Sequence, residues 1–436
     1  MAELIAPQVL KGFRDALPSG EIPRRTLLAK LERVFTSYGF VPIDTPALEY
    51  AEILLGKGGG ETEKQMFRFE DNGGRDIALR FDLTVPFARF MATNLAQLPL
   101  PFKRYHMAKV WRGEKPQKGR YREFYQCDCD IVGVDSAAAD FEILSVMASA
   151  LIEVKAGRFT ILVNHRGLFN RFLEKIGNRE RSVEILRTVD KLGKLGRTEI
   201  QAQLTALAGE AAAEQILCFV EASGDFSAVL SELETLAGGG AEDSQRLREI
   251  FNLLKHTGLE SHFRLAPSIT RGLDYYTGVV FETVLEDLPE IGSVCSGGRY
   301  NDLANLYTKE KLPGIGGSVG LDRLMTALEE LGRLPRSATT SQLLILNSGP
   351  DQAGAAHALA AAFRSRGVRC EVYLDDRKIS AQYKYAETKG IPFVASLGTG
   401  PQPAQDQPCQ LKDIRSGESR PVTLNEALEW MNTERV

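Results

Sequence analysis

The sequence predicts an α+β protein: a β-rich core flanked by helices, a helical insertion within that core, and a separate C-terminal α/β domain. Three observations support this prediction. Residues 102–133 have the composition of a long basic hairpin, residues 170–262 are mostly helical, and strands alternate with helices beyond residue 342. Segregated strands and helices are typical of α+β folds, whereas their regular alternation indicates an α/β unit.

Length and composition indicate a globular protein of two or three domains with a large core. Of the 436 residues, 25% are charged and 43% are hydrophobic, as in ordinary soluble proteins. We expect no membrane span, because no apolar run approaches about 18 residues, and no secretory signal, because the N-terminus lacks an apolar stretch. The net charge of −4 disfavours non-specific nucleic-acid binding but permits a local basic patch.

The cysteines are scattered and show no disulfide-like spacing, which predicts reduced thiols in a cytoplasmic protein. They are Cys127, Cys129, Cys218, Cys295, Cys370 and Cys409. Cys127 and Cys129 share one face of a predicted strand, but a tetrahedral zinc site normally needs wider spacing and further ligands. The sequence therefore leaves metal ligands unassigned.

Residues 23–38 are predicted to form an amphipathic helix that leads into a strand. Pro23 suits a first helical position and Gly39 suits a left-handed cap, with apolar residues at helical spacing between them. Residues 40–45 are then extended up to Pro46. We interpret this unit as scaffold, and a subunit interface remains open as the alternative.

A second hairpin is predicted at residues 66–69 and 77–81, around a turn sequence that contains Asn-Gly-Gly. Asp82, Leu83 and Thr84 follow it, and Pro86 suits the start of a helix. Asp82 and Thr84 lie on one side of an extended segment, where they can bind a ligand's ammonium group. The alternative is that they cap the following helix.

The basic hairpin carries the clearest signal of a binding site. Its strands are predicted at residues 102–112 and 124–132, and its loop at residues 113–119 is rich in Gly, Pro and Lys. Between Lys103 and Arg122 there are eight Lys or Arg residues and a single acid, Glu114.

Strand alternation places Gln126, Asp128 and Asp130 on one face of the second strand, next to the cationic loop. The opposite face holds Cys127 and Cys129. Two carboxylates and an amide beside a basic loop suit a ligand that has both an ammonium group and a phosphate. A solvated hairpin of mixed charge is the alternative.

Residues 170–262 are predicted to form a helical insertion that carries no chemical constellation of its own. Its last helix has an apolar stripe and ends near Gly258. The core resumes at residues 271–302. There Tyr275 and Tyr276 can frame a planar group of a ligand. The alternative is that they are ordinary strand residues, one buried and one exposed. The nearby glycines allow the backbone to approach a ligand closely.

The glycine-rich run GIGGSVGLDRLM at residues 314–325 is predicted to open a helix. It fails as a dinucleotide-binding fingerprint because Val319 stands where the third glycine is required. Arg323 is expected in the first helical turn, where a guanidinium group can bind a phosphate.

We expect a first domain at residues 1–335, a linker at residues 336–341 and an α/β domain at residues 342–436. Strands are predicted at residues 342–346, 368–374, 391–397 and 409–414, and helices at residues 351–366, 378–389 and 423–432.

Two segments, RGLDYYTGVVFE (271–282) and VCSGGRYNDL (294–303), resemble the signature segments of histidyl-tRNA synthetases, which belong to class II of the aminoacyl-tRNA synthetases. WRGEKPQKGRYREFYQCDCDIVG, GIGGSVGLDRLM and YGFVPIDTPALEY resemble motifs 2, 3 and 1 of that class. Residues 375–398 resemble the family's anticodon-binding domain. The resemblance covers essentially the whole chain and implies a class II antiparallel catalytic sheet and a homodimer.

The resemblance also implies roles for individual residues. Arg112 and Arg271 are implied as catalytic residues at the α-phosphate, and Arg112 and Arg323 as ATP-binding residues. The implied histidine-binding residues are Asp82, Leu83, Thr84, Arg112, Gln126, Asp130, Arg271, Tyr275 and Tyr276. The motif 2 loop is implied to contact tRNA through Lys115, Gln117, Lys118 and Arg120.

The implied activity is a two-step ligation. Histidine and ATP give histidyl-adenylate and diphosphate, and the histidyl group then passes to the terminal ribose of tRNA(His). Cations fixed at the α-phosphate would offset the repulsion between the two anionic reactants, and no protein nucleophile is needed. Mg²⁺ is expected with ATP. The expected partners are L-histidine, ATP and tRNA(His), and no association with a membrane is expected.

Small departures from the family pattern leave recognition of the tRNA acceptor end open. Asp82 and Asp130 are shorter acids where other members carry Glu. The sequence around them is more similar to the eukaryotic-type branch of the family. The alternative function is a histidine-sensing regulatory subunit of an ATP-phosphoribosyltransferase. Such chains generally lack the C-terminal domain, whereas this sequence has it together with Arg112, Arg271 and Arg323.

Overall fold

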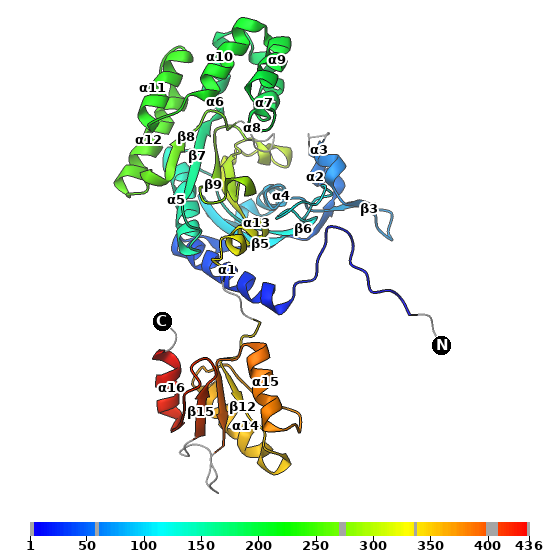
Figure 1. Cartoon of the computed structure of the whole chain (residues 1–436). Helices are drawn as coiled ribbons and strands as arrows, with labels where there is room; N and C mark the ends of the chain where they lie inside the picture. Colours follow the sequence, from blue (N-terminus) through cyan, green and yellow to red (C-terminus); the bar gives the residue numbers. More distant parts are fainter. Residues whose placement is uncertain (1–3, 57–60, 270–275, 335–337, 398–408, 434–436) are drawn as a thin grey trace. The chain divides into compact units, whose positions relative to one another are not determined.

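The computed structural model describes residues 4–56, 61–269, 276–334, 338–397 and 409–433 (Figure 1). The chain divides into two compact units. The first comprises residues 1–15 and 26–334, and the second comprises residues 16–25 and 335–436. Within the described residues, every helix is too short or too polar to cross a membrane.

The first unit is built on an eight-stranded sheet with the order β1-β5-β6-β11-β10-β9-β7-β8. The outer pairs β1–β5 and β7–β8 are parallel, and the pairs between them are antiparallel. The strands are β1 (Val41–Pro42), β5 (Phe102–Trp111), β6 (Glu123–Val132), β7 (Phe159–His165), β8 (Phe263–Leu265), β9 (Val279–Leu285), β10 (Cys295–Arg299) and β11 (Gly314–Gly320). The predicted α+β class with an antiparallel core sheet is confirmed.

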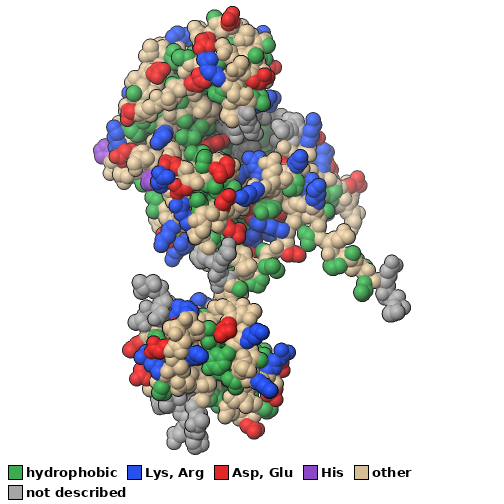
Figure 2. Space-filling model, in the orientation of Figure 1, with side chains coloured by type: hydrophobic (Ala, Val, Ile, Leu, Met, Phe, Trp, Pro, Cys, Tyr) green, Lys and Arg blue, Asp and Glu red, His purple; other side chains and the backbone are tan. Residues whose placement is uncertain are grey.

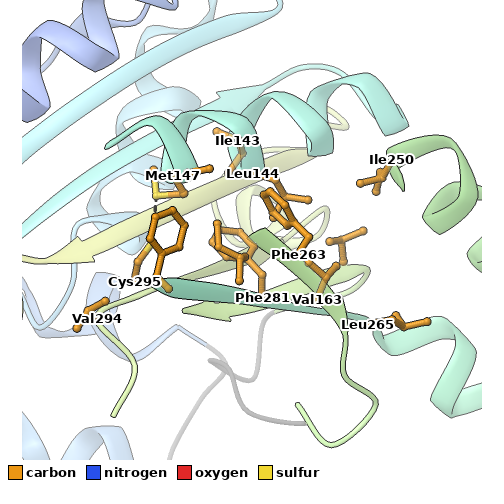
Figure 3. Packing of buried hydrophobic residues seen from close by; sticks show 14 of the residues in the cluster. Ile143, Leu144, Met147, Val163, Ile250, Phe263, Leu265, Phe281, Val294 and Cys295 are labelled. Carbon is orange, nitrogen blue, oxygen red and sulfur yellow. Dashed lines mark hydrogen bonds between the residues drawn. The ribbon is translucent and has the colours of Figure 1, made fainter. Parts of the chain in front are cut away.

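One face of this sheet is covered by α5 (Ala137–Glu153), an apolar helix capped by the Ser136 hydroxyl, which accepts a hydrogen bond from the N–H of Ala139. Figure 3 shows Leu144 and Met147 of this helix pointing at Phe281 and Cys295 of the sheet. The thiol of Cys295 lies 3.1 Å from the sulfur of Met147. This apolar layer forces the polar side chains of the central strands onto the other face.

The predicted alternation along the second hairpin strand is confirmed. Cys127, Cys129 and Ile131 of β6 are buried in the same apolar cluster as α5. Gln126, Asp128 and Asp130 therefore face away from the helix, because successive strand side chains point to opposite faces.

The glycine-rich run opens a helix as predicted, because α13 (Leu321–Glu330) begins within residues 314–325, but its glycines lie in strand β11, which the sequence did not predict. β11 is hydrogen-bonded to β6 on one side and to β10 on the other. A Cβ at Gly316 would lie 1.9 Å from Oδ1 of Asp130. The glycines thus serve close packing within a sheet, which sequence periodicity does not distinguish from a helix start. Arg323 lies in the first turn of α13, as predicted.

The N-terminal scaffold also differs in its limits. Helix α1 (Pro18–Ser37) begins before the predicted start, and the strand predicted at residues 40–45 shrinks to β1. The N–H of Ile43 still donates to the carbonyl of Tyr105 at 3.1 Å. Beyond it, the Asp44 carboxylate accepts a hydrogen bond from the N–H of Thr45 at 2.8 Å. Such local side-chain bonding competes with the strand ladder and ends it.

The predicted hairpin at residues 66–81 is present as β3 (Arg68–Glu70) and β4 (Asp76–Leu79), which form a small sheet with β2 (Leu48–Tyr50). Helices α2 (Ala51–Leu55), α3 (Glu61–Gln65) and α4 (Thr84–Asn94) accompany it.

The helical insertion runs from α6 to α12. Its helices are α6 (Arg166–Lys175), α7 (Ser182–Val189), α8 (Leu192–Leu195), α9 (Arg197–Ala208), α10 (Glu210–Glu221), α11 (Phe226–Leu236) and α12 (Glu242–His256). The last helix is fixed to the core through Asp140 of α5, which is fully buried. Its carboxylate lies 2.5 Å from Nε of Arg246 in α12 and 2.6 Å from Nη2 of Arg299 in β10.

The second unit holds a five-stranded sheet with the order β13-β12-β14-β15-β16. Its elements are β12 (Leu343–Ile345), α14 (Pro350–Ser365), β13 (Cys370–Val372), α15 (Ile379–Lys389), β14 (Phe393–Ser396), β15 (Cys409–Asp413), β16 (Ser419–Val422) and α16 (Leu424–Thr433). The alternation predicted from the sequence is present, and β16 is an additional edge strand. A separate apolar cluster that includes Phe363 and Trp430 fills this unit. The domain limits drawn from the sequence remain predictions.

Candidate active site

The polar face of β6 carries a buried acidic surface. Asp128 and Asp130 are each only 2% exposed. On the neighbouring strand β5, Arg104 lies opposite Asp130 and His106 lies opposite Asp128. On the other side, Gly316 of β11 lies opposite Asp130 and leaves room for its carboxylate. The sheet register therefore concentrates charged groups at its centre.

Asp130 is held by two side chains that the sequence did not single out as site residues. Nη2 of Arg104 lies 2.8 Å from Oδ2 of Asp130, and the hydroxyl of Tyr300 donates to Oδ1. Burial raises the pKa of Asp130, and Arg104 and Tyr300 act in the opposite direction. Because the Arg104–Asp130 pair is buried, each charge depends on the other. This pair fixes the carboxylate in one orientation.

Asp128 is less well satisfied. Burial raises its pKa to about 7, although Arg104 opposes that shift. Among the described residues, its Oδ1 and the Oε1 of Gln126 have no hydrogen-bond partner. Gln126 donates through Nε2 to the hydroxyl of Ser318 at 2.9 Å. Buried acceptors normally find a donor, so these atoms indicate a place where a ligand supplies one.

The segment after β4 joins this surface from the side. Asp82 and Leu83 are buried, and Thr84 is half-buried at the start of α4. Oδ1 of Asp82 accepts a hydrogen bond from the N–H of Val85 at 3.0 Å. Asp82 therefore binds one N–H of the first turn of α4, whose N-cap position is occupied by Leu83. The carbonyl of Leu83 accepts from Arg104 at 3.4 Å, which ties this segment to β5.

Tyr276 belongs to the same group of residues. Burial, followed by the charges of Asp130 and Asp128, raises its pKa far above the ordinary value. Its carbonyl accepts a hydrogen bond from Nη1 of Arg166 at 2.8 Å. The other two residues predicted here, Arg271 and Tyr275, lie outside the described residues.

A cationic cavity of about 200 Å³ adjoins the acidic surface. Nε of Arg112 donates to the carbonyl of Phe81 at 2.9 Å, and Nη1 of Arg323 donates to the carbonyl of Ser293. The lining residues are Arg112, Glu114, Gly119, Arg120, Tyr121, Phe124, Gln126, Ser293, Val294, Cys295, Ser296, Ser318, Gly320, Asp322 and Arg323.

Electrostatics indicate that this cavity suits an anion. Burial, together with the positive charges of Arg120 and Arg112, lowers the pKa of Arg323 to about 10. Three guanidinium groups around one cavity repel one another until an anionic ligand neutralises them. Planar guanidinium groups bind phosphate oxygens through two parallel hydrogen bonds. The cavity is thus chemically suited to a polyphosphate.

The predicted tRNA-contacting residues lie on the loop between β5 and β6. Lys115, Gln117, Lys118 and Arg120 are all exposed. Lys118 pairs with Glu330 at 2.7 Å, whereas Arg120 lines the cationic cavity. Figure 2 shows Lys and Arg side chains on the visible face of this unit.

The structure brings together most of the residues that the sequence predicted. Asp82, Gln126, Asp130 and Tyr276 converge on the acidic surface, and Arg112 and Arg323 converge on the cavity. Sequence reasoning missed Arg104 and Tyr300 as site residues. Arg104 shares strand parity with His106, which was a usable signal, whereas nothing local to Tyr300 marks it as a partner of Asp130.

Comparisons with known proteins agree with this geometry. A family model described as histidyl-tRNA synthetase matches residues 12–324, and one described as an anticodon binding domain matches residues 342–434. The histidine–tRNA ligase of Treponema denticola is 55% identical over 90% of this chain and 89% of its own length. That of Rhodopirellula baltica is 45% identical over 97% of this chain and 96% of its own length.

A solved structure is similar over the whole chain. The crystal structure of histidyl-tRNA synthetase from Nostoc sp. PCC 7120 covers 99% of this chain and 100% of that chain, with a TM-score of 0.89 and 30% sequence identity. The sheet with its insertion and the C-terminal unit are therefore each shared with a known fold.

Proposed function

Because this chain belongs to the histidyl-tRNA synthetase family, we propose that it is a histidine–tRNA ligase that uses ATP to charge tRNA(His) with L-histidine. The observation that carries the proposal is the adjacency of the buried acidic surface on β6 and the cavity lined by three arginines. An amino acid brings an ammonium group and a carboxylate, and ATP brings a triphosphate. The two halves of the site match these charges.

In the first step, the acidic surface holds histidine. Asp82, Thr84 and Asp130 bind or orient the ammonium group, Gln126 accepts from the ligand, and Leu83 contributes its backbone. Tyr275 and Tyr276 line the imidazole pocket. Polar groups that only an imidazole satisfies give strong discrimination against other side chains, because the wrong side chain leaves them unpaired.

ATP enters the cavity, where Arg323 binds the triphosphate and Arg112 and Arg271 bind the α-phosphate. The histidine carboxylate attacks the α-phosphorus, and diphosphate leaves. The arginines stabilise the charge that develops on the phosphate oxygens. Holding both reactants in line contributes on the order of 7–11 kcal/mol to lowering the barrier.

Mg²⁺ is expected to accompany ATP. Such an ion usually needs only one or two protein carboxylates together with phosphate oxygens and water. Glu114 supplies a carboxylate at the cavity and fits this requirement. When bound, the ion would neutralise part of the triphosphate charge.

In the second step, the histidyl group passes to the terminal ribose of tRNA(His). The exposed residues Lys115, Gln117, Lys118 and Arg120 of the loop would contact the acceptor end. The second unit, which matches the anticodon-binding model, would bind the anticodon. Lys and Arg at such surfaces supply the salt-dependent part of tRNA affinity.

We further propose a cytoplasmic homodimer. The six cysteines are free thiols, as a reducing compartment would keep them. Val41, Leu48 and Tyr50 are large apolar residues with 47%, 43% and 51% exposure, in the segment that resembles the dimer-forming motif. Apolar side chains exposed together are typical of an interface.

The regulatory-subunit alternative is not favoured. The similar curated proteins from Treponema and Rhodopirellula are named as ligases, at 45–55% identity. Adenylate formation would need Arg112 and Arg323, and both line one cavity.

The test is ATP–diphosphate exchange with each of the twenty amino acids, followed by charging of tRNA(His). We expect exchange with histidine alone, and its loss in Arg271→Ala. Calorimetric histidine binding without any exchange would overturn the ligase proposal and favour the regulatory subunit.

A further inference from the structure

The N-terminal segment at residues 11–14 is attached to the loop that carries Arg120. The N–H of Arg122 donates to the carbonyl of Gly12 at 2.9 Å, and Nη1 of Arg122 donates to the carbonyl of Lys11 at 3.2 Å. The rings of Phe13 and Phe67 meet edge to face with centroids 5.9 Å apart. Backbone and side-chain contacts thus fix the segment against the base of the loop.

Arg14 extends from this segment to two walls of the cationic cavity. Its guanidinium carbon lies 3.8 Å from the ring centroid of Tyr121, and its Nη2 pairs with Oδ1 of Asp322. Tyr121 and Asp322 both line the cavity. A guanidinium group stacked on an aromatic ring while bound to a carboxylate is held in one orientation.

Asp322 needs this partner. It is only 4% exposed, and its Oδ2 accepts the N–H of Tyr125 at 2.7 Å. It therefore fastens β6 to the start of α13, one residue before Arg323. Its carboxylate also stands in a cavity proposed to bind a triphosphate, where an uncompensated negative charge would repel the ligand.

We propose that Arg14 is a positioning residue for ATP. It holds the wall of the cavity through Tyr121 and neutralises Asp322, so that the triphosphate meets a positive surface. This inference rests on the proposed function, because it assigns the cavity to ATP.

The first experiment measures KM for ATP and for histidine in the exchange reaction, using the full-length chain. Arg14→Ala is expected to raise KM for ATP about tenfold, the effect of one charge-assisted hydrogen bond, with KM for histidine changed by less than about twofold. Arg14→Lys keeps the charge and should recover part of the loss. Arg33→Ala is the matched control, because Arg33 forms an exposed pair with Glu153.

A second experiment separates charge neutralisation from general damage. Asp322→Asn removes the charge that Arg14 compensates, so Arg14→Ala should raise KM for ATP much less in that background than in the wild-type chain. Equal effects of Arg14→Ala in both backgrounds would overturn the electrostatic part of the proposal.

A third experiment measures proteolysis and does not depend on catalytic activity. Trypsin should cleave the ligand-free chain after Lys118 or Arg120 several-fold faster in Arg14→Ala than in the wild type or in Arg33→Ala, as mapped by mass spectrometry. If the wild type catalyses histidine-dependent exchange while Arg14→Ala matches it in KM for ATP and in cleavage, this inference alone fails. If the wild type shows no exchange, the proposed function fails, and the cleavage rates still report on the attachment.

Discussion

At the scale of single residues, the site depends on how burial is compensated. Asp130 has an ion pair with Arg104 at Oδ2 and a hydrogen bond from Tyr300 at Oδ1, whereas Oδ1 of Asp128 has neither a hydrogen bond nor an ion pair among the described residues. Two carboxylates on one strand face, two residues apart, are therefore in different electrostatic situations. The sequence identified both positions but not this difference, because Arg104 and Tyr300 reach Asp130 from distant parts of the chain.

Asp128→Asn tests the cost of that burial. Burial raises the pKa of Asp128 from 3.8 to about 7, so the folded chain keeps a proton that the unfolded chain releases. Stability is therefore lost as the pH rises from about 4 to 7, and the amide is exempt from this loss. At pH 8 we expect Asp128→Asn to have a free energy of unfolding higher than that of the wild type by on the order of a few kcal/mol, and therefore to unfold at a higher temperature. The difference should vanish near pH 4. Thermal melts at both pH values check this, and a constant difference would contradict it.

Arg323→Ala tests the cationic cavity. Removing a guanidinium group that stabilises charge in the transition state is expected to lower kcat/KM for ATP about 10²–10³-fold, with little change in thermal stability because Arg323 is only half-buried. Steady-state exchange kinetics measure this. Arg68→Ala, which breaks an exposed pair with Asp76, serves as control, and similar kinetics for both variants would place ATP elsewhere.

At the scale of elements, the sequence predicted the type of most segments but not all their limits. Residues 102–132 were identified by their alternation and turn chemistry, and their strands β5 and β6 match the prediction closely. The sequence predicted the helix that the glycine-rich run opens but not strand β11 before it, because periodicity carries no information about the close packing of this strand between β6 and β10.

Gly316→Ala tests this explanation. A Cβ at this position would lie 1.9 Å from Oδ1 of Asp130, so the carboxylate or the strand must move. We expect a loss of about 1–3 kcal/mol of stability and a raised KM for histidine. Gly354→Ala in α14 is the matched control, because nothing lies within 4 Å of the added atom and alanine favours a helix. Denaturant melts that show equal effects for the two variants would refute the explanation.

At the scale of the molecule, each unit contains its own apolar cluster. The linker composition and the change in pattern after residue 342 predict a separate C-terminal domain, whose limits remain a prediction. The sequence carries no direct signal for the buried attachment of the insertion at Asp140, because Arg246 and Arg299 are far from Asp140 in the sequence.

Phe363→Ala tests whether the second unit binds tRNA while the first unit activates histidine. Phe363 is fully buried in the second unit, so its truncation is expected to cost about 3–5 kcal/mol there. Charging of tRNA(His) should fall, while histidine-dependent exchange stays within roughly twofold, since distant sites act independently. Parallel exchange and charging assays measure this, and an equal loss in both would contradict the assignment of tRNA binding to the second unit.

The order of strands in the main sheet has a consequence for biosynthesis. β6 pairs with β11, so that Val132 lies opposite Gly314, and the whole helical insertion is translated between them. At cellular elongation rates this takes roughly ten to forty seconds. Throughout that time the nascent chain exposes one open edge of β6. Ribosome-associated chaperones therefore encounter an incomplete sheet. Slow codons within the insertion would prolong the time during which the free edge of β6 can aggregate.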